Sequence, residues 1–333
     1  MSEPMVLGFE TKEVKEQMVS ANEKMGNIFK YALIAKDTDY PILLTGETGT
    51  GKDLLAKIIH FNSGRKNKSF VAVDCTAIPE TLIESRLFGH RKGSYTGALE
   101  NSPGYIESAE GGTVYLDEIG DINQSTQIKL FRLVEEKQYA RLGENKLRKA
   151  DIRIITATNK DLETLVKENK FRDALYYRLK VFDLHLPPLR ERPEDIPVLI
   201  EHFLRKYSPN GRKIILDPKI LEFFLGYDWP GNVRELENLI KKSLSIFVKS
   251  ELPIETEFIS LDFFQQWGFD KVFLKESETE RSFAEQVNKF EKELIIKALM
   301  KANWVKKEAA RILGMPESTL RFKMKQYNIT LPA

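Results

Sequence analysis

The chain has 333 residues, of which 42% are hydrophobic and 30% charged, with a formal net charge of +2 at pH 7. This length is sufficient for two or three domains with a buried core, and the composition excludes a chain that is disordered throughout. No apolar run reaches the length of a membrane span, and the N-terminus lacks a signal-peptide pattern.

A single cysteine, Cys75, excludes an internal disulfide and predicts a reducing, cytoplasmic location. The histidines lie far apart and show no metal-ligand spacing with Cys75. These histidines are His60, His90, His185 and His202.

Five short apolar runs rich in β-forming residues alternate with helical patterns along the first part of the chain. Strands that alternate with helices predict an α/β fold in which helices wrap a parallel sheet. The expected strands are residues 41–45, 70–74, 113–117, 152–156 and 181–186.

A different pattern follows Pro187-Pro188, which ends the last expected strand. Apolar residues recur at helical spacing between 193 and 249, which predicts a small all-helical domain. Residues 251–282 mix short apolar and acidic segments and are interpreted as a linker. The helical pattern returns from 283 to 327.

A glycine-rich loop, Gly46-Glu-Thr-Gly-Thr-Gly-Lys52, joins the first expected strand to a helical segment. Its glycines allow backbone N–H groups to approach phosphates, the helix N-terminus favours their negative charge, and Lys52 would reach the β- and γ-phosphates. Asp53 stands where most such loops have the Ser or Thr that binds Mg²⁺. The residues expected to bind ATP are Gly46, Glu47, Thr48, Gly49, Thr50, Gly51, Lys52 and Asp53.

The third expected strand ends in Asp117-Glu118. A carboxylate at this position can hold Mg²⁺ through water, and the next glutamate can orient and deprotonate an attacking water. The pair is common by itself, but together with the phosphate loop it favours hydrolysis over binding alone. Asn159, after the fourth strand, either senses the γ-phosphate or water, or caps a turn.

Two arginines, Arg172 and Arg178, lie on a predicted helix before the last strand. Six residues rotate by about 600°, so the two side chains do not share one face. They either reach two different sites, such as a neighbouring subunit's phosphate and an interface carboxylate, or form surface salt bridges.

Residues 89–98 suit no nucleotide chemistry. Gly93 and Gly97 bracket Ser94, Tyr95 and Thr96, so this stretch can form a tight, flexible tip that holds an aromatic ring in solvent. An ATPase with such a loop is expected to push on a partner. The expected contact residues are Gly93, Ser94, Tyr95, Thr96, Gly97 and Ala98.

The end of the chain is basic: residues 301–325 hold seven Lys or Arg against two Glu. Residues 305–313 and 317–325 predict two helices with Gly314 at the turn, and Ala309, Leu313 and Leu320 have the spacing of a small core. This helix-turn-helix binds DNA or serves only as a packing unit. The expected DNA contacts are Ser318, Thr319, Arg321 and Lys323.

From about Met18 to the C-terminus the chain resembles the σ54-dependent transcriptional activators, which are bacterial enhancer-binding proteins of the AAA+ class. That family usually carries an acidic residue after its P-loop lysine, as Asp53 does here. Its signature loop normally reads Gly-Ala-Phe-Thr-Gly-Ala, whereas residues 93–98 read Gly-Ser-Tyr-Thr-Gly-Ala.

The resemblance implies roles for single residues. Asp117 would hold Mg²⁺ and Glu118 would be the catalytic base, with Asp74 near it. Asn159 would be the first sensor, and Arg172 and Arg178 would reach into a neighbour's site. Arg234, in the motif that begins at Trp229, would contact the γ-phosphate from a helical lid. Since an arginine finger contributes roughly 10³–10⁵ in rate, hydrolysis is expected to require an oligomer.

The resemblance also implies the organisation and the partners. The expected parts are a short N-terminal segment (1–17), an AAA+ ATPase domain with the σ54-contacting loop (18–187), an α-helical lid (188–250), a linker (251–282) and a Fis-like helix-turn-helix domain (283–333). Expected cofactors are ATP and Mg²⁺. Expected partners are σ54, RNA polymerase, double-stranded DNA at enhancer-like sites and further copies of the chain, from dimer to hexameric ring, with no membrane.

No receiver or sensor domain is expected before the ATPase domain, so control would come from a protein acting in trans, from expression level or from a domain removed from the chain. Two alternatives stay open. One is a DNA-binding regulator with a vestigial nucleotide domain that acts without σ54. The other is an AAA+ remodeller unrelated to transcription, against which the helix-turn-helix argues.

Overall fold

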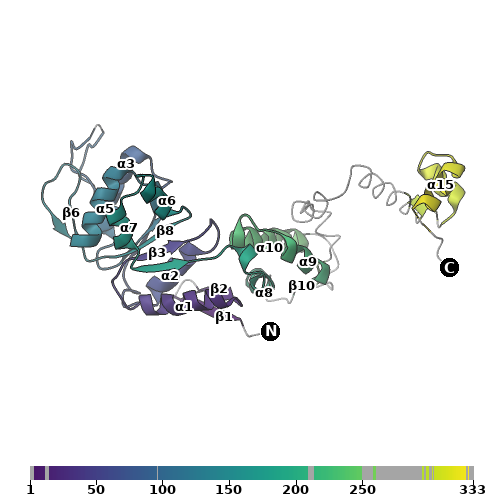
Figure 1. The fold of residues 1–333 in the computed structure, drawn as a ribbon, viewed down its shortest axis with the longest axis horizontal. Helices are drawn as coiled ribbons and strands as arrows, with labels where there is room; N and C mark the ends of the chain where they lie inside the picture. The colour runs from purple at the N-terminus through teal and green to yellow at the C-terminus, as the bar shows by residue number, and fades with distance from the viewer. Residues whose placement is uncertain are drawn as a thin grey trace. The chain divides into compact units, whose positions relative to one another are not determined.

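The computed structural model describes residues 4–11, 15–95, 97–208, 214–249 and 258–259, and, nearer the C-terminus, 295, 298–299, 302, 304–327 and 329. The chain divides into two compact units, Met1–Phe264 and Gln265–Ala333. The first unit holds a central sheet with helices on it, and the second holds α15 (Figure 1).

The central sheet has five parallel strands in the order β4-β5-β8-β3-β9, which confirms the predicted α/β fold. A strand is present at each predicted position. Because the strands are parallel, their carboxyl ends meet at one edge, where Asp117 pairs with Asp74 and Thr45 with Thr158. The strands are β3 (Ile42–Thr45), β4 (Phe70–Asp74), β5 (Thr113–Asp117), β8 (Arg153–Thr158) and β9 (Phe182–His185).

Helices cover both faces of this sheet. Successive strand residues point to opposite faces, so Leu43 lies in one buried cluster while Ile42 and Leu44 lie in the other. The Leu43 cluster includes α3 (Glu80–Phe88), α4 (Tyr105–Ser108), α5 (Gln124–Glu136), α6 (Leu162–Lys167) and α7 (Asp173–Leu179), and the other includes α1 (Glu23–Ala35) and α2 (Lys52–Phe61). Burial on both faces explains why β3, in the interior of the sheet, begins with the apolar run Ile42, Leu43 and Leu44.

An antiparallel hairpin precedes α1, in a region for which the sequence analysis expects no element up to residue 17. It consists of β1 (Met5–Glu10) and β2 (Lys15–Ser20), with Met5 paired to Ser20. Leu7 and Phe9 alternate with exposed residues and are buried in the same cluster as α2, where the Phe9 ring stacks on Phe61 with centroids 4.5 Å apart. The hairpin is therefore part of the core of the sheet domain.

The lid follows β9 and a short 3₁₀ helix, η2 (Leu189–Glu191). It is helical as expected, and buried Trp229 donates from Nε1 to the Phe224 carbonyl at 2.8 Å. One feature was not expected: a two-residue parallel pair joins Ile215 to Phe258, within the range predicted as linker. The lid elements are α8 (Asp195–Tyr207), β10 (Ile215–Leu216), α9 (Pro218–Gly226), α10 (Asn232–Lys249) and β11 (Phe258–Ile259).

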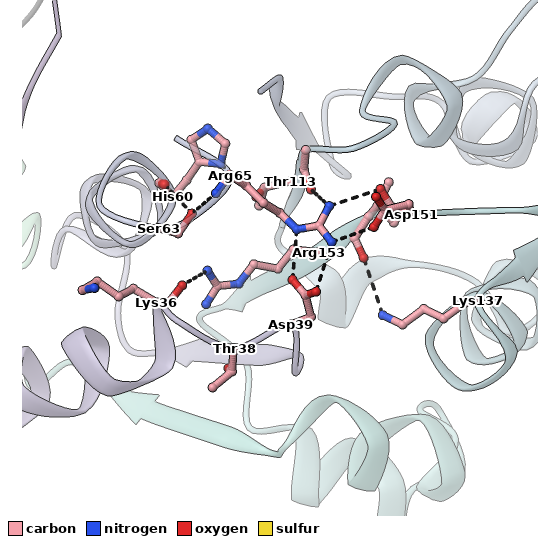
Figure 2. Close-up of polar contacts among 12 residues, drawn as sticks. Lys36, Thr38, Asp39, His60, Ser63, Arg65, Thr113, Lys137, Asp151 and Arg153 are labelled. Atoms are coloured by element: carbon pink, nitrogen blue, oxygen red, sulfur yellow. Dashed lines mark hydrogen bonds and ion pairs between the residues drawn. The ribbon is translucent and has the colours of Figure 1, made fainter. Parts of the chain in front are cut away.

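A polar cluster lies at the amino ends of the strands, opposite to the edge where their carboxyl ends meet. Figure 2 shows the Arg65 guanidinium between Asp39 and Asp151, to which it donates at 2.9 and 2.6 Å. Arg153, at the start of β8, is 1% exposed and donates to the carbonyls of Ala35 and Lys36 at 2.6 and 3.0 Å. These carbonyls end α1, so Arg153 caps that helix from the sheet.

Replacing Arg153 with Ala should lower the free energy of unfolding by about 2–4 kcal/mol, because it removes the guanidinium donors of two helix-end carbonyls and opens a cavity. Urea unfolding followed by circular dichroism measures the change. Arg205→Ala is the control: it removes an ion pair with Glu201 that lies in solvent, so its effect should stay within about 0.5 kcal/mol. Equal midpoints for the two variants would contradict this role of Arg153.

Two smaller elements belong to the segment between α5 and β8. They are the antiparallel pair β6 (Gln138–Tyr139) and β7 (Arg148–Lys149), which enclose a loop from 140 to 147. A 3₁₀ turn, η1 (Ile119–Asp121), follows β5 directly.

In the second unit, α14 (Lys306–Ile312) and α15 (Glu317–Gln326) occupy the positions of the two helices predicted there.

Candidate functional site

The glycine-rich loop between β3 and α2 has a backbone that only glycine adopts without strain. Gly46, Gly49 and Gly51 have φ values of 140°, 83° and 104°. A Cβ at Gly46 would lie 2.4 Å from the Leu186 carbonyl oxygen, and one at Gly49 would lie 2.2 Å from that of Gly231. The loop is thus fixed against β9 and the lid, and it leads into the N-terminus of α2, where anions bind favourably.

Lys52 is the first residue of α2 and only 6% exposed. Its Nζ donates to the carbonyls of Gly46 and Glu47 at 2.7 and 3.1 Å, which keeps the ammonium group inside the loop. Burial lowers the pKa of Lys52, while the charges of Glu118 and Asp117 act in the opposite direction. The predicted phosphate-binding lysine therefore lies within electrostatic reach of the predicted catalytic carboxylates.

Asp117, Glu118 and Asn159 come together at the carboxyl edge of the sheet. Glu118 adopts a left-handed backbone (φ 51°), and its N–H donates to Asp117 Oδ1 at 3.1 Å. Its Oε2 accepts from the Asn159 backbone N–H at 3.0 Å, and Asn159 Nδ2 donates to Thr48 Oγ1 at 3.1 Å. Asn159 thus connects the glutamate to the phosphate loop.

Asp74, which the resemblance places near Glu118, has its hydrogen bonds in the turn after β4. Its Oδ1 accepts from Thr76 Oγ1 at 2.7 Å and from the backbone N–H groups of Thr76 and Ala77. The Thr76 hydroxyl is the main cause of the lowered pKa of Asp74. Asp74 is therefore held as an acceptor at the end of its own strand.

The Mg²⁺ ion expected from the resemblance fits the chemistry of this edge. Carboxylate oxygens are ligands that Mg²⁺ prefers, and the ion usually takes its other ligands from water and phosphates. In the part of the chain that the structure describes, no group of three or more His, Cys, Asp or Glu side chains is arranged to hold a metal. Asp117 would therefore hold the ion together with nucleotide and water.

A cavity of about 210 Å³ opens beside the phosphate loop. The loop and α2 line one side, β2 lines another, and α8 and α10 of the lid close it. Arg234 reaches it from α10, and its backbone N–H donates to the Gly49 carbonyl at 3.2 Å. The further lining residues that the sequence analysis missed include Met18, Val19, Arg192, Leu199, His202 and Phe203.

Arg178 lies on α7, and Arg172 immediately precedes that helix. Arg172 stands just before the helix, where its backbone N–H donates to Gln127 Oε1 at 2.8 Å. The Arg178 guanidinium pairs with Glu135 of α5. Neither arginine is among the residues that line the cavity within the described ranges.

The glycine-bracketed loop has two left-handed hinges. Gly93 and Gly97 have φ values of 79° and 103°, and a Cβ at either would meet no described atom within 4 Å. The Gly93 N–H donates to the Ala98 carbonyl at 2.9 Å, which closes the tip. Glycine is therefore required at both positions by the left-handed backbone and not by a lack of room for a side chain. Thr96 lies outside the described residues.

Tyr95 is exposed, as the sequence predicts, and its ring also has a neighbour. Its ring packs edge-on against His90 with centroids 5.1 Å apart and is 37% exposed, whereas Leu99 is 78% exposed. His90 in turn contacts Ser85 of α3 through Nδ1 at 2.8 Å. The aromatic ring at the tip is therefore connected to α3, and Leu99 is an additional apolar group that the loop presents.

A second loop, 140–147, supports the base of the first. The Leu142 N–H donates to the Gly89 carbonyl at 2.9 Å, and the Arg91 N–H donates to the Leu142 carbonyl at 3.0 Å. Arg91 also pairs with Glu144. Leu147 of the second loop is 54% exposed, so the two loops present apolar side chains on one hydrogen-bonded support.

The second unit has a small buried core around its two helices. Ala309 and Leu320 are fully buried, Leu313 packs against them, and Gly314 adopts a φ of 64° at the turn. Arg321 pairs with Glu317 one turn earlier, at 2.6 Å. All four expected DNA contacts, Ser318, Thr319, Arg321 and Lys323, belong to α15. None of the helices in the described ranges is both long and apolar enough to span a bilayer.

Comparison with known protein families divides the chain into three successive segments. Residues 18–185 match the family described as Sigma-54 interaction domain, and residues 190–265 match AAA+ ATPase lid domain. Residues 286–327 match Bacterial regulatory protein, Fis family.

Several curated proteins are similar to the chain. Regulatory protein AtoC of Escherichia coli (strain K12) is 42% identical, over 86% of this chain and 62% of AtoC. The Nif-specific regulatory protein of Azotobacter vinelandii is 41% identical, over 86% and 54%. Transcriptional regulatory protein ZraR of Escherichia coli (strain K12) is 37% identical, over 92% and 68%. The chain thus spans between 54% and 68% of the length of these relatives.

Solved structures agree with this grouping. The crystal structure of NtrX from Brucella abortus in complex with ATP superimposes with a TM-score of 0.68 at 30% identity, and it covers 94% of this chain and 70% of that chain. The ADP complex of NtrX gives a TM-score of 0.67 at 29% identity, with the same coverage.

Proposed function

The chain belongs to the family of σ54-dependent transcriptional activators, and we propose that it hydrolyses ATP to remodel σ54–RNA polymerase from the closed to the open complex. In this proposal it binds double-stranded DNA at enhancer-like sites upstream of promoters through its helix-turn-helix. Because its proposed partners are DNA and RNA polymerase, it would act in the cytoplasm.

One observation carries the proposal: the nucleotide site and the glycine-bracketed loop are joined by a short, ordered path. β4 ends at Asp74 beside Asp117, α3 begins at Glu80, and the loop begins where α3 ends at Gly89. Ser85 of α3 contacts His90, on which the Tyr95 ring rests. A change at the carboxyl edge of the sheet can therefore reach the loop through α3.

The residues of the site have distinct parts in the proposed hydrolysis. The loop N–H groups and Lys52 would hold the phosphates, and Asp117 would hold Mg²⁺ through water. Bound Mg²⁺ would neutralise charge on the phosphate oxygens. Glu118 would orient the attacking water and accept its proton, while Asn159 keeps the Glu118 carboxylate beside Thr48. Arg234 would contact the γ-phosphate from the lid.

We propose that assembly completes the site. Arg172 and Arg178 lie apart from their own chain's cavity, on α7, and a neighbouring copy is where their guanidinium groups would meet a phosphate. A group of this kind contributes roughly 10³–10⁵ in rate. ATPase activity per chain should therefore rise steeply with protein concentration, and the active form would be a homo-oligomer, up to a hexameric ring.

The direct test is in vitro transcription with the purified full chain, ATP and a promoter that carries an upstream site for it. Open complexes should form with the σ54 holoenzyme and fail to form without hydrolysable ATP. The alternative is a DNA-binding regulator with a vestigial nucleotide domain that acts without σ54. Activation of a holoenzyme with another σ factor, independent of ATP, would support that alternative and overturn the proposal.

DNA binding by α15 has its own prediction. Arg321→Ala should weaken specific DNA binding about tenfold, because it removes one charged contact with a base or phosphate. If the contact is to phosphate, the slope of log affinity against log salt should also fall by about 1. Fluorescence anisotropy at several salt concentrations measures both. Arg311→Ala is the matched control, since Arg311 of α14 forms a similar pair with Glu308, and an equal loss in both variants would contradict a special role for α15.

A further inference from the structure

The carboxylate of Glu47 faces the lid, although Glu47 belongs to the phosphate loop. Its two oxygens accept from Arg190 Nη1 and Nη2 at 2.8 and 2.5 Å, and Oε2 also accepts from Asn232 Nδ2 at 3.2 Å. The Arg190 guanidinium, and after it Asn232, lower the pKa of Glu47 to about 2. The carboxylate is therefore ionised at any physiological pH, and it joins the loop to two parts of the lid region.

Asn232 is the centre of this contact. It is fully buried and has a left-handed backbone with φ 53°. Besides Glu47, its Nδ2 donates to the Thr48 carbonyl at 3.0 Å, and its Oδ1 accepts from the Leu189 N–H at 2.8 Å. One amide thus connects the phosphate loop, the segment that enters the lid, and the N-terminus of α10.

The same helix end carries Arg234, two residues after Asn232. The Arg234 N–H donates to the Gly49 carbonyl at 3.2 Å, and the Gly231 carbonyl approaches Gly49 so closely that no side chain fits there. The described lid therefore meets the phosphate loop at Glu47, Thr48 and Gly49 through the first turn of α10. Any shift of Asn232 relative to this loop would move the backbone that positions Arg234.

We propose that Glu47, Arg190 and Asn232 form a lid latch, a set of positioning residues that holds Arg234 at the phosphate end of the cavity and thereby lets the site distinguish ATP from ADP. The inference rests on the proposed function, since it assumes that Arg234 reads the γ-phosphate. None of the three latch residues needs to touch the nucleotide with its side chain. Their effect is expected through Arg234 alone.

The test compares affinities of the full chain for ADP and for the slowly hydrolysed analogue ATPγS, each with Mg²⁺, by isothermal titration calorimetry. The readout is the ratio of the two dissociation constants, which a general loss of folded protein does not change. Arg234→Ala sets the ratio expected when the γ-phosphate contact is lost. Circular dichroism confirms that each variant is folded.

Asn232→Asp keeps the size and the left-handed preference of the residue but removes both N–H donors and places a second carboxylate beside Glu47. It should reduce the preference for ATPγS over ADP about tenfold. Arg190→Ala should reduce it about threefold, because this pair is partly exposed. Arg190→Lys keeps the charge and should restore part of the preference.

A double variant tests whether Asn232 acts through Arg234. In an Arg234→Ala background, Asn232→Asp should change the ratio no further, because the residue through which it acts is gone. Arg205→Ala, which removes an exposed pair on α8, should leave the ratio at the wild-type value. If Arg234→Ala lowers the ratio but Asn232→Asp and Arg190→Ala do not, the latch is wrong and the nucleotide assignment stands. If Arg234→Ala itself leaves the ratio unchanged, the γ-phosphate role under the proposed function fails, and the latch fails with it.

Discussion

Glu118→Gln should reduce the kcat of ATP hydrolysis by about 10²–10⁴-fold, the range that a positioned general base contributes. The amide keeps the shape of the side chain and can still accept from the Asn159 N–H through its oxygen, so the loop and the sheet edge should keep their arrangement. What the amide loses is the ability to take a proton from water. Nucleotide affinity should therefore change by no more than about twofold.

Steady-state phosphate release gives kcat, and titration with ATPγS gives the affinity of the same preparation. Glu201→Gln is the matched control, since it makes the same chemical change on an exposed side chain of α8. Turnover by Glu118→Gln at the wild-type rate would remove Glu118 from the catalytic role. Loss of binding together with turnover would indicate instead that the carboxylate organises the loop.

The parallel sheet and the phosphate loop could be predicted from the sequence because both depend on local pattern. Strands buried on two faces are continuous apolar runs, as β3 shows with the buried residues Ile42, Leu43 and Leu44. The loop glycines have positive φ values, a conformation that glycine adopts without strain. The two helices of the second unit were predictable for the same reason, since Gly314 marks the turn between them.

Features that depend on contacts between distant residues were not predictable. Asp195 of α8 is fully buried and accepts from Ser20 Oγ at 2.8 Å across 175 positions of sequence. Burial raises the pKa of Asp195, while the bond from Ser20 and the charge of Arg192 oppose that change. This contact attaches the lid to the hairpin end. Neither partner has a local pattern that would have indicated it.

Glu47 illustrates the same limit within the site. The motif assigns it to the phosphate loop, and its backbone is there, but the direction of its carboxylate depends on Arg190, 143 positions away. A motif fixes which residues stand near a ligand and leaves open which way each side chain points. The direction of the Glu47 carboxylate is set by its contact with Arg190 in the folded chain.

Thr96→Ala should separate ATP hydrolysis from promoter opening, and we expect it to abolish open-complex formation by the σ54 holoenzyme. Hydrolysis should stay within about twofold of wild type, because the sequence assigns Thr96 to the loop that would contact σ54 and not to the nucleotide site. The flanking hinges at Gly93 and Gly97 meet no described atom that a Cβ would touch.

Two further variants test whether promoter opening needs the ring of Tyr95 or its hydroxyl group. Tyr95→Phe restores the residue usual in the family and should open promoters at least as well as wild type, since the ring and its contact with His90 remain. Tyr95→Ala should lose opening while keeping hydrolysis. Leu225→Ala, at an exposed apolar position of α9 in the lid, is the control for loss of apolar surface as such.

The combined outcomes decide between a contact role and a structural one. If Thr96→Ala opens promoters normally while it hydrolyses ATP, the loop does not contact σ54 and the assignment is wrong. If Thr96→Ala and Tyr95→Ala lose hydrolysis as well, the loop acts back on the nucleotide site through His90, Ser85 and α3. If the loop contacts σ54 and moves with ATP hydrolysis, both variants should lose promoter opening while ATP hydrolysis stays intact.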